Sequence, residues 1–260
     1  MVTVRLIADF LEEFAPSELA EDWDNVGLLV GDDRQQVASV MTCLTITPPV
    51  IAEAVERGAG LIVAHHPLPF RALKRLTRES HDGRMLLDLI AAGIAVYSPH
   101  TAFDSAQQGI NQQLADGLQL VDAAPLVPGE TTLGSGRWGT LFAPISLGEL
   151  AQRAKTFLRI DGLHLVGEPD RPVTRVAVAC GSAGELLDAA RQQQCDALLL
   201  GETRFHTCLE AEAAGIGLVL AGHYASERFA VQQLAVVLAD AFADTNIWAS
   251  RVEQDPLSWV

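Results

Sequence analysis

The sequence predicts an α/β protein of two similar lobes, each with a mainly parallel or mixed sheet. Short apolar runs alternate with helical patterns along the chain, and the pattern of the first half returns in the second. Such alternation is typical of βαβ units, in which helices connect parallel strands. A chain of 260 residues can form one large domain or two smaller ones. The repeat favours two.

Each element follows from a short local pattern. The strand candidates are the apolar runs VASVMTCLTI, GLIVA, GIAVYS, VTRVAVAC, DALLLG and GIGLVLAG. The helix candidates are PPVIAEAVERGAG, MLLDLIAAG, GELLDAARQQQC, TCLEAEAAG and ISLGELAQRAKTFL. Several of these end at a glycine, as a helix C-cap does. Ser146 and Glu149 stand at capping-box spacing at the start of the last one.

The internal repeat becomes visible when the two halves are aligned. The stretch VMTCLTITPPVIAEAVERGAGLIVAHH matches VAVACGSAGELLDAARQQQCDALLLGE, which pairs Cys43 with Cys180 and His65 with Glu202. Further on, GIAVYSPHTAFD matches GIGLVLAGHYASE, and both contain His-x-x-x-acid. The Gly-, Pro- and Thr-rich stretch between the halves predicts a boundary, with lobes at 1–124 and 125–260.

Composition excludes some classes of function. The chain has 33 acidic and 18 basic side chains, a formal charge of -15, which would repel phosphate backbones and anionic lipid. We therefore do not expect nucleic acid as a partner. No apolar run approaches the roughly 18 residues of a membrane span, and acidic residues interrupt the N-terminus where a signal peptide needs an apolar core. We expect a cytoplasmic protein with four reduced cysteines.

The segment GSGRWG fits the dinucleotide-binding pattern G-x-G-x-x-G through Gly134, Gly136 and Gly139. That pattern binds a pyrophosphate only at a turn from a strand to a helix. No βαβ turn is predicted around it, so we do not expect a dinucleotide site.

Five of the seven histidines stand at or just beyond predicted strand ends: His65, His66, His100, His206 and His223. The carboxyl ends of parallel strands meet at one edge of a sheet, where open α/β proteins bind ligands. If a helix follows the strand in each case, His100 with Asp104 and His223 with Glu227 form i, i+4 pairs on one helix face. Each pair can then supply a nitrogen and an oxygen to the same point.

Imidazole and carboxylate ligands suit Zn, Fe, Mn, Co or Ni. The six candidate ligands are more than one tetrahedral ion needs, which predicts two divalent ions with a bridging water: His65, His66, His100, Asp104, His223 and Glu227. A single histidine at a strand end is more often structural, and a single pair is usually a surface ion pair. Their coincidence at one edge favours metal binding. For His206, proton transfer, support of a ligand and simple packing stay open.

Arg71, Lys74, Arg75 and Arg78 follow the adjacent histidines and would share one helical face. A solvated face is the simpler interpretation. Four of only 18 cations beside a metal site would, however, suit a phosphorylated substrate. The hypothesis is that Arg71 and Lys74 bind substrate phosphate.

Motifs across nearly the whole chain resemble the Nif-three-like family of dinuclear metal-centre proteins, often named GTP cyclohydrolase I type 2 homologues. They are WDNVGLLVGD, AHHPLPF, SPHTAFD, GSGRWG, LGETRFH and AGHYASE. The resemblance implies two lobes with the metal pair in the cleft between them, the six ligands named above, and a toroidal homohexamer, a trimer of dimers. Trp23, Asp24, Asn25 and Gly27 belong to the opening motif. By themselves they indicate a turn or cap, with cleft lining as the alternative.

Two functions follow. The first is a metal-dependent hydrolase of the GTP cyclohydrolase I type 2 homologue type. It would act on a phosphorylated or nucleotide substrate through a metal-bridging hydroxide, with His206 moving the proton. The alternative is a non-enzymatic metal-binding scaffold or metal carrier. The cationic run favours the enzyme, because a carrier needs no phosphate anchor.

Overall fold

The computed structural model describes residues 2–129 and 133–258 and divides the chain into two compact units. The first comprises Met1–Phe103 and Ala230–Pro256, and the second comprises Asp104–Phe229 with the last four residues. The chain therefore passes from the first unit to the second between residues 103 and 104, and returns between residues 229 and 230. Composition predicted a single boundary between residues 124 and 125. The C-terminal segment belongs to the first unit because its strand pairs there.

The first unit is built on a five-stranded sheet in the order β1-β4-β3-β2-β11. Four of its strands run parallel, and β1 (Gly27–Val30) is antiparallel to its neighbour. The parallel strands are β2 (Ser39–Cys43), β3 (Leu61–Ala64), β4 (Ala95–Ser98) and β11 (Asn246–Ala249). Residues at the ends of β2, β3 and β4 therefore share one edge of this sheet.

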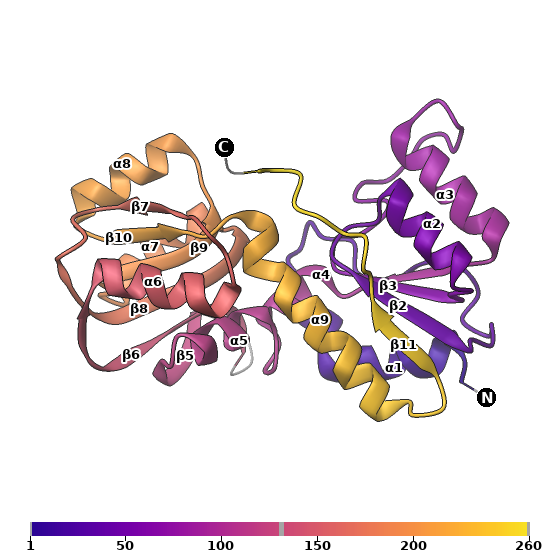
Figure 1. Cartoon of the computed structure of the whole chain (residues 1–260), viewed down its shortest axis with the longest axis horizontal. Helices are drawn as coiled ribbons and strands as arrows, with labels where there is room; N and C mark the ends of the chain where they lie inside the picture. The colour runs from indigo at the N-terminus through magenta and orange to yellow at the C-terminus, as the bar shows by residue number, and fades with distance from the viewer. Residues whose placement is uncertain (1, 130–132, 259–260) are drawn as a thin grey trace. The chain divides into compact units, whose positions relative to one another are not determined.

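Helices cover both faces of this sheet. On one face α2 (Pro48–Glu56) and α3 (His81–Ala92) lie side by side (Figure 1), and they bury Met41, Ile62 and Val96. Thr42, the neighbour of Met41 in β2, donates through its hydroxyl to the carbonyl oxygen of Val231 in α9 (His223–Ala241), which places the C-terminal part of α9 on the other face. The first helix, α1 (Val4–Phe14), follows the Thr3 cap and contacts β1. A 3-10 turn, Ser17–Leu19, follows α1. Alternate residues of each strand thus face different helices, as expected for a covered parallel sheet.

The second unit has a six-stranded mixed sheet in the order β5-β6-β8-β9-β10-β7. Only β8, β9 and β10 run parallel to one another. The strands are β5 (Val121–Pro128), β6 (Gly134–Ser146), β7 (His164–Val166), β8 (Pro172–Ser182), β9 (Ala197–Glu202) and β10 (Gly217–Leu220). The antiparallel strands flank this parallel centre on both sides.

The core of the second unit lies between the sheet and short helices. Leu198 and Leu200 of β9 pack with Leu187 and Ala211 from the helices that precede and follow that strand. The helices of this unit are α5 (Ile110–Gly117), α6 (Leu147–Leu158), α7 (Leu187–Gln192) and α8 (Phe205–Ala214), with the 3-10 turn Gly184–Leu186 and the start of α9. The Ser146 side chain accepts a hydrogen bond from the Glu149 amide, which confirms the predicted cap of α6.

The structure reproduces the internal repeat. The order β2-α2-β3-α3-β4-α4 in one half corresponds to β8-α7-β9-α8-β10-α9 in the other, where α4 is His100–Ser105. In both, the three strands are neighbours and parallel. The helices that begin at His100 and His223 are therefore equivalent, and both follow their strands within three residues, which meets the condition for the two i, i+4 pairs.

The prediction of a helical face carrying Arg71, Lys74, Arg75 and Arg78 is wrong. The segment 67–79 forms turns and bends, and α3 begins only at His81, where Ser80 accepts a hydrogen bond from the Gly83 amide. A helix needs a buried apolar stripe, but Leu73 and Leu76 in this segment are exposed. The four cations are exposed as well, and Arg78 is paired with Asp88 on α3.

The glycines of GSGRWG lie within β6 and not at a strand-to-helix turn, so the dinucleotide-site motif lacks its required context. The segment instead presents Arg137, whose guanidinium is buried. It donates to the carbonyl oxygens of Gly134 and Gly136 and to those of Ser105 and Ala106 at the end of α4, over 2.7–3.0 Å. Because each donor has an acceptor, this buried charge fixes β6 to the end of α4.

Glu53 on α2 fastens the C-terminal segment of the first unit. Its buried carboxylate accepts hydrogen bonds from Trp248 Nε1, Ser250 Oγ and the Arg251 amide. Burial raises the pKa of Glu53, but these hydrogen bonds, with that from Arg57, outweigh it and hold the pKa below 4.5.

No helix in the described part of the chain is long and apolar enough to span a bilayer.

We predict that Glu53→Gln destabilises the protein by about 1–3 kcal/mol at pH 7, because an amide NH2 would face donors. A folded pKa below the unfolded value means that the carboxylate stabilises the fold above about pH 4.5 and stops doing so as the pH falls through the folded pKa. Urea denaturation of both proteins should therefore show a difference that shrinks below pH 4.5. Glu56→Gln, an exposed position on the same helix, is the matched control. Equal losses for both variants would contradict the assignment.

Candidate metal centre

Three imidazoles gather at the strand-end edge of the first unit. His65 and His66 directly follow β3, and His100 begins the helix after β4. One ring nitrogen from each lies within 4.8 Å of the others, and the ring centroids are 5.1–5.7 Å apart. Three imidazole nitrogens at this spacing could hold a divalent metal ion. We call these three residues the histidine cluster.

The backbone that carries the histidine cluster is tied to the sheet. The amides of His65 and His66 donate to the carbonyl oxygens of Cys43 and Leu44, which continues the β2–β3 ladder past the strand ends. Ser98 Oγ donates to the carbonyl oxygen of His65 over 2.7 Å. His65 is 2% exposed and His100 8%. The ordered strands therefore position the buried rings of His65 and His100.

Asp24 orients His100. Its buried carboxylate accepts a hydrogen bond from His100 Nδ1 over 2.7 Å and others from the amide and hydroxyl of Thr101. Burial raises the pKa of Asp24, but the bonds from His100 and Thr101 outweigh it and lower the pKa to about 2. A carboxylate that holds the Nδ1–H of a histidine leaves Nε2 as the ligand atom.

Sequence reasoning predicted a turn or cap at Asp24, with cleft lining as the alternative, and missed its contact with His100. The two partners are 76 residues apart, so no local pattern links them. A second supporting contact was missed as well: Thr45, just beyond β2, places its hydroxyl 2.7 Å from His66 Nδ1. Both contacts orient an imidazole by its Nδ1 atom.

In the second unit, His223 lies between two carboxylates. Its Nδ1–H donates to Glu202 Oε1 over 2.9 Å, and its Nε2 lies 3.2 Å from Glu227 Oε2. The hydrogen bond to Glu227 is the main cause that raises the pKa of His223 to about 9, and burial opposes it. Two carboxylates around one imidazole favour positive charge at this place, so the donor set fits a cation.

A glycine makes room for the Glu227 carboxylate. Gly181 in β8 has φ +62°, and a Cβ there would lie 2.3 Å from Glu227 Oε1. The Gly181 amide donates to Ser226 Oγ, which donates in turn to the carbonyl oxygen of His223. Only glycine combines this backbone conformation with the missing side chain. Local sequence gives no signal for this, because the two residues are 46 positions apart.

Asp104, the remaining predicted ligand, is held by Cys180. The thiol donates to Asp104 Oδ1 over 3.1 Å, and Asn111 Oδ1 accepts from the Cys180 amide. Burial, followed by the nearby charges of Asp104 and Glu227, raises the pKa of Cys180, which keeps the thiol a donor. No disulfide involves any of the four cysteines, and Cys180 is buried.

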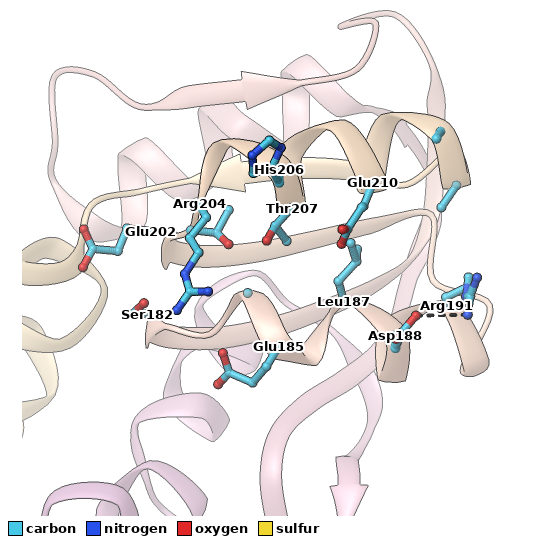
Figure 2. Close-up of a pocket in the computed structure, with 14 residues that line it drawn as sticks. Ser182, Glu185, Leu187, Asp188, Arg191, Glu202, Arg204, His206, Thr207 and Glu210 are labelled. Atoms are coloured by element: carbon cyan, nitrogen blue, oxygen red, sulfur yellow. Dashed lines mark ion pairs between the residues drawn. The ribbon is translucent and has the colours of Figure 1, made fainter.

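His206, the predicted proton carrier, is exposed in the first turn of α8. It lines a polar pocket of about 1070 Å³ in the second unit together with Glu202, Ser182, Thr203 and Arg204. Figure 2 shows Arg204 extending into this pocket and His206 at the start of α8. Glu202 thus belongs both to this pocket and to the group around His223. Arg71 and Lys74, the predicted phosphate ligands, are exposed beside Phe70 in the first unit.

Comparisons with known proteins agree with the fold and the motifs. Residues 2–256 match the model of the family Duf34/NIF3 (NGG1p interacting factor 3). The chain is 32% identical to a "GTP cyclohydrolase 1 type 2 homolog" from Clostridium acetobutylicum, over 97% of both chains. It is 35% identical to one from Streptomyces coelicolor, over 93% of this chain and 87% of that one.

A solved structure from Bacillus cereus, described as a protein related to NIF3, matches with a TM-score of 0.92. The match covers 100% of this chain and 99% of that one, at 23% identity, which supports the fold alone. The resemblance inferred from the six motifs is confirmed. The chain belongs to the Duf34/NIF3 family.

Proposed function

We propose that the protein binds two divalent metal ions through His65, His66, His100, Asp104, His223 and Glu227. The observation that carries the proposal is the histidine cluster, in which three imidazole nitrogens lie within 4.8 Å of one another. The group of His223 and Glu227 supplies a second set of donors. Mixed nitrogen and oxygen ligands suit Zn, Fe, Mn, Co or Ni.

We further propose that the protein is a metal-dependent hydrolase acting on a phosphorylated or nucleotide substrate. When bound, paired metal ions lower the pKa of a water molecule and stabilise the negative charge that develops in hydrolysis. The relatives named GTP cyclohydrolase 1 type 2 homologs support this class of reaction. The homohexamer implied by the family resemblance and the cytoplasmic location expected from the sequence stay predictions.

The protein's own residues have separate tasks in this proposal. Asp24 and Glu202 accept the Nδ1–H groups of His100 and His223 and so hold both rings in the tautomer that presents Nε2. His206, which shares the polar pocket with Glu202, is the proposed proton donor and acceptor, because histidine is the side chain most often used for proton transfer. Arg71 and Lys74 are the proposed phosphate ligands.

The first test is metal content and turnover. The two-metal hypothesis predicts that protein purified without chelators contains about two divalent ions per chain. Elemental analysis measures this content. His65→Ala should lower this content and abolish metal-dependent GTP hydrolysis, because a strand-fixed ligand is lost. The exposed His81→Ala is the matched control. If His65→Ala kept full activity, the mechanism would be wrong; metal binding without turnover of any nucleotide would instead favour a metal carrier.

The second test concerns Gly181. We predict that Gly181→Ala weakens metal binding at least tenfold, because the new methyl group displaces the Glu227 carboxylate. Gly215→Ala is the control, since Gly215 has a similar φ of +70° but no atom within 4 Å of the added Cβ. Both variants should lose about 1–2 kcal/mol of stability from the positive φ. Competition with a metal-binding dye measures the affinity, and equal affinities in the two variants would exclude Glu227 as a ligand.

The third test concerns the phosphate ligands. Arg71→Ala with Lys74→Ala should raise the KM of an active phosphorylated substrate roughly tenfold, because each cation contributes a charge-assisted hydrogen bond. The kcat should change little, since neither residue belongs to the donor groups. Arg34→Ala, an exposed cation of the same unit, should leave both constants unchanged. An unchanged KM in the double variant would show that Arg71 and Lys74 do not bind the substrate phosphate.

A further inference from the structure

Two large aromatic side chains stand exposed beside the histidine cluster. Trp23 is 61% exposed and Phe70 44%, whereas His65 and His100 next to them are buried. The ring centroids of Trp23 and Phe70 are 5.9 Å apart, and each lies 6.0 Å from that of His100. Exposed aromatic rings next to a buried polar cluster are unfavourable in water and typically mark a binding surface. We call these two residues the aromatic pair.

The segments that carry the aromatic pair are fixed by hydrogen bonds on both sides. Asp24, next to Trp23, is held by His100 and Thr101. The Asn25 side chain donates to the carbonyl oxygen of Pro69, the residue before Phe70, over 2.8 Å. The pair is therefore anchored before any ligand arrives, and ordering it costs little conformational entropy on binding. A turn or cap alone would not require two exposed rings in contact.

Cations follow the aromatic pair directly. Arg71 adjoins Phe70, and Lys74 lies three residues further along; both are exposed. Stacking rings with cations beside them form the usual arrangement for a base and its phosphate. The formal charge of -15 opposes a nucleic-acid polymer, whose affinity depends on many phosphate contacts. A mononucleotide needs only one or two such contacts.

We propose that Trp23 and Phe70 bind the heteroaromatic ring of a nucleotide substrate by stacking, while Arg71 and Lys74 hold its phosphate. A ring stacked on either side chain would lie about 3.5 Å from it, within reach of the histidine cluster. The aromatic pair then determines specificity, because it selects substrates with a planar ring over other phosphate esters. This inference rests on the proposed function in assigning the bound nucleotide as substrate.

The test compares two probes on full-length protein purified without chelators. Isothermal titration calorimetry measures the binding of GMP and of ribose 5-phosphate, which lacks the ring. Trp23→Leu and Phe70→Leu should each weaken GMP binding roughly tenfold or more, the usual loss when a stacking aromatic is removed. Ribose 5-phosphate binding should not change. Trp23→Phe should restore most of the GMP affinity, because a stacking face remains.

Phe142→Leu is the matched control, since Phe142 is a highly exposed aromatic in the second unit. It should bind both probes like the wild type. The proposal is overturned if the wild type does not bind GMP, if Trp23→Leu and Phe70→Leu bind GMP unchanged, or if both probes weaken equally. A change of oligomeric state in light scattering with unchanged GMP affinity also overturns it, because a second copy would then cover the pair.

Metal content separates this inference from the proposed function. All aromatic variants should keep the wild-type metal content by elemental analysis, because neither ring is a metal ligand. If His65→Ala loses metal but Trp23→Leu binds GMP like the wild type, the stacking inference is overturned and the metal centre is still supported. GMP binding that depends on Trp23 in a protein without metal would support the ring site and overturn the metal-dependent function.

Discussion

The pairing of adjacent parallel strands is the constraint on which both donor groups depend. In the first unit β2, β3 and β4 run in register, with Thr42 opposite Val63 and Val63 opposite Tyr97. Residues just past the three ends therefore meet at one edge without any long loop to order. A slip of one residue would turn the side chains to the other face of the sheet. The position of the histidine cluster thus follows from the same hydrogen bonds that make the sheet.

Local signals located the parallel strands of both sheets and the histidines of the candidate site in the first unit. The apolar runs that end at His65 and His100 indicated strands. Because the carboxyl ends of parallel strands meet at one edge of a sheet, these histidines were expected to lie close together. The repeat predicted that His223 would stand where His100 stands, and both begin a helix after a strand. Where a candidate ligand directly follows a strand, the periodicity of the sequence is enough to locate it.

Supporting residues could not be predicted because their partners are distant in sequence. Asp24 acts on His100 and Gly181 on Glu227, and neither position carries a periodic signal. The helix predicted after Phe70 was wrong for a different reason. The spacing of its cations suited a helix, but its leucines are exposed. Charge spacing describes a helix that already exists. It does not supply the packing that makes one form.

The two repeats have diverged toward different donors, and this difference has chemical consequences. Corresponding positions carry His65 in one half and Glu202 in the other, so one group is made of imidazoles and the other surrounds His223 with carboxylates. Imidazole nitrogens favour borderline ions such as zinc or iron(II), whereas carboxylates add negative charge and accept harder ions. Two bound ions would therefore not be equivalent. Because a carboxylate is an anionic ligand and an imidazole a neutral one, we expect the carboxylates to neutralise most of the charge of bound ions, while the imidazoles determine which metal is preferred.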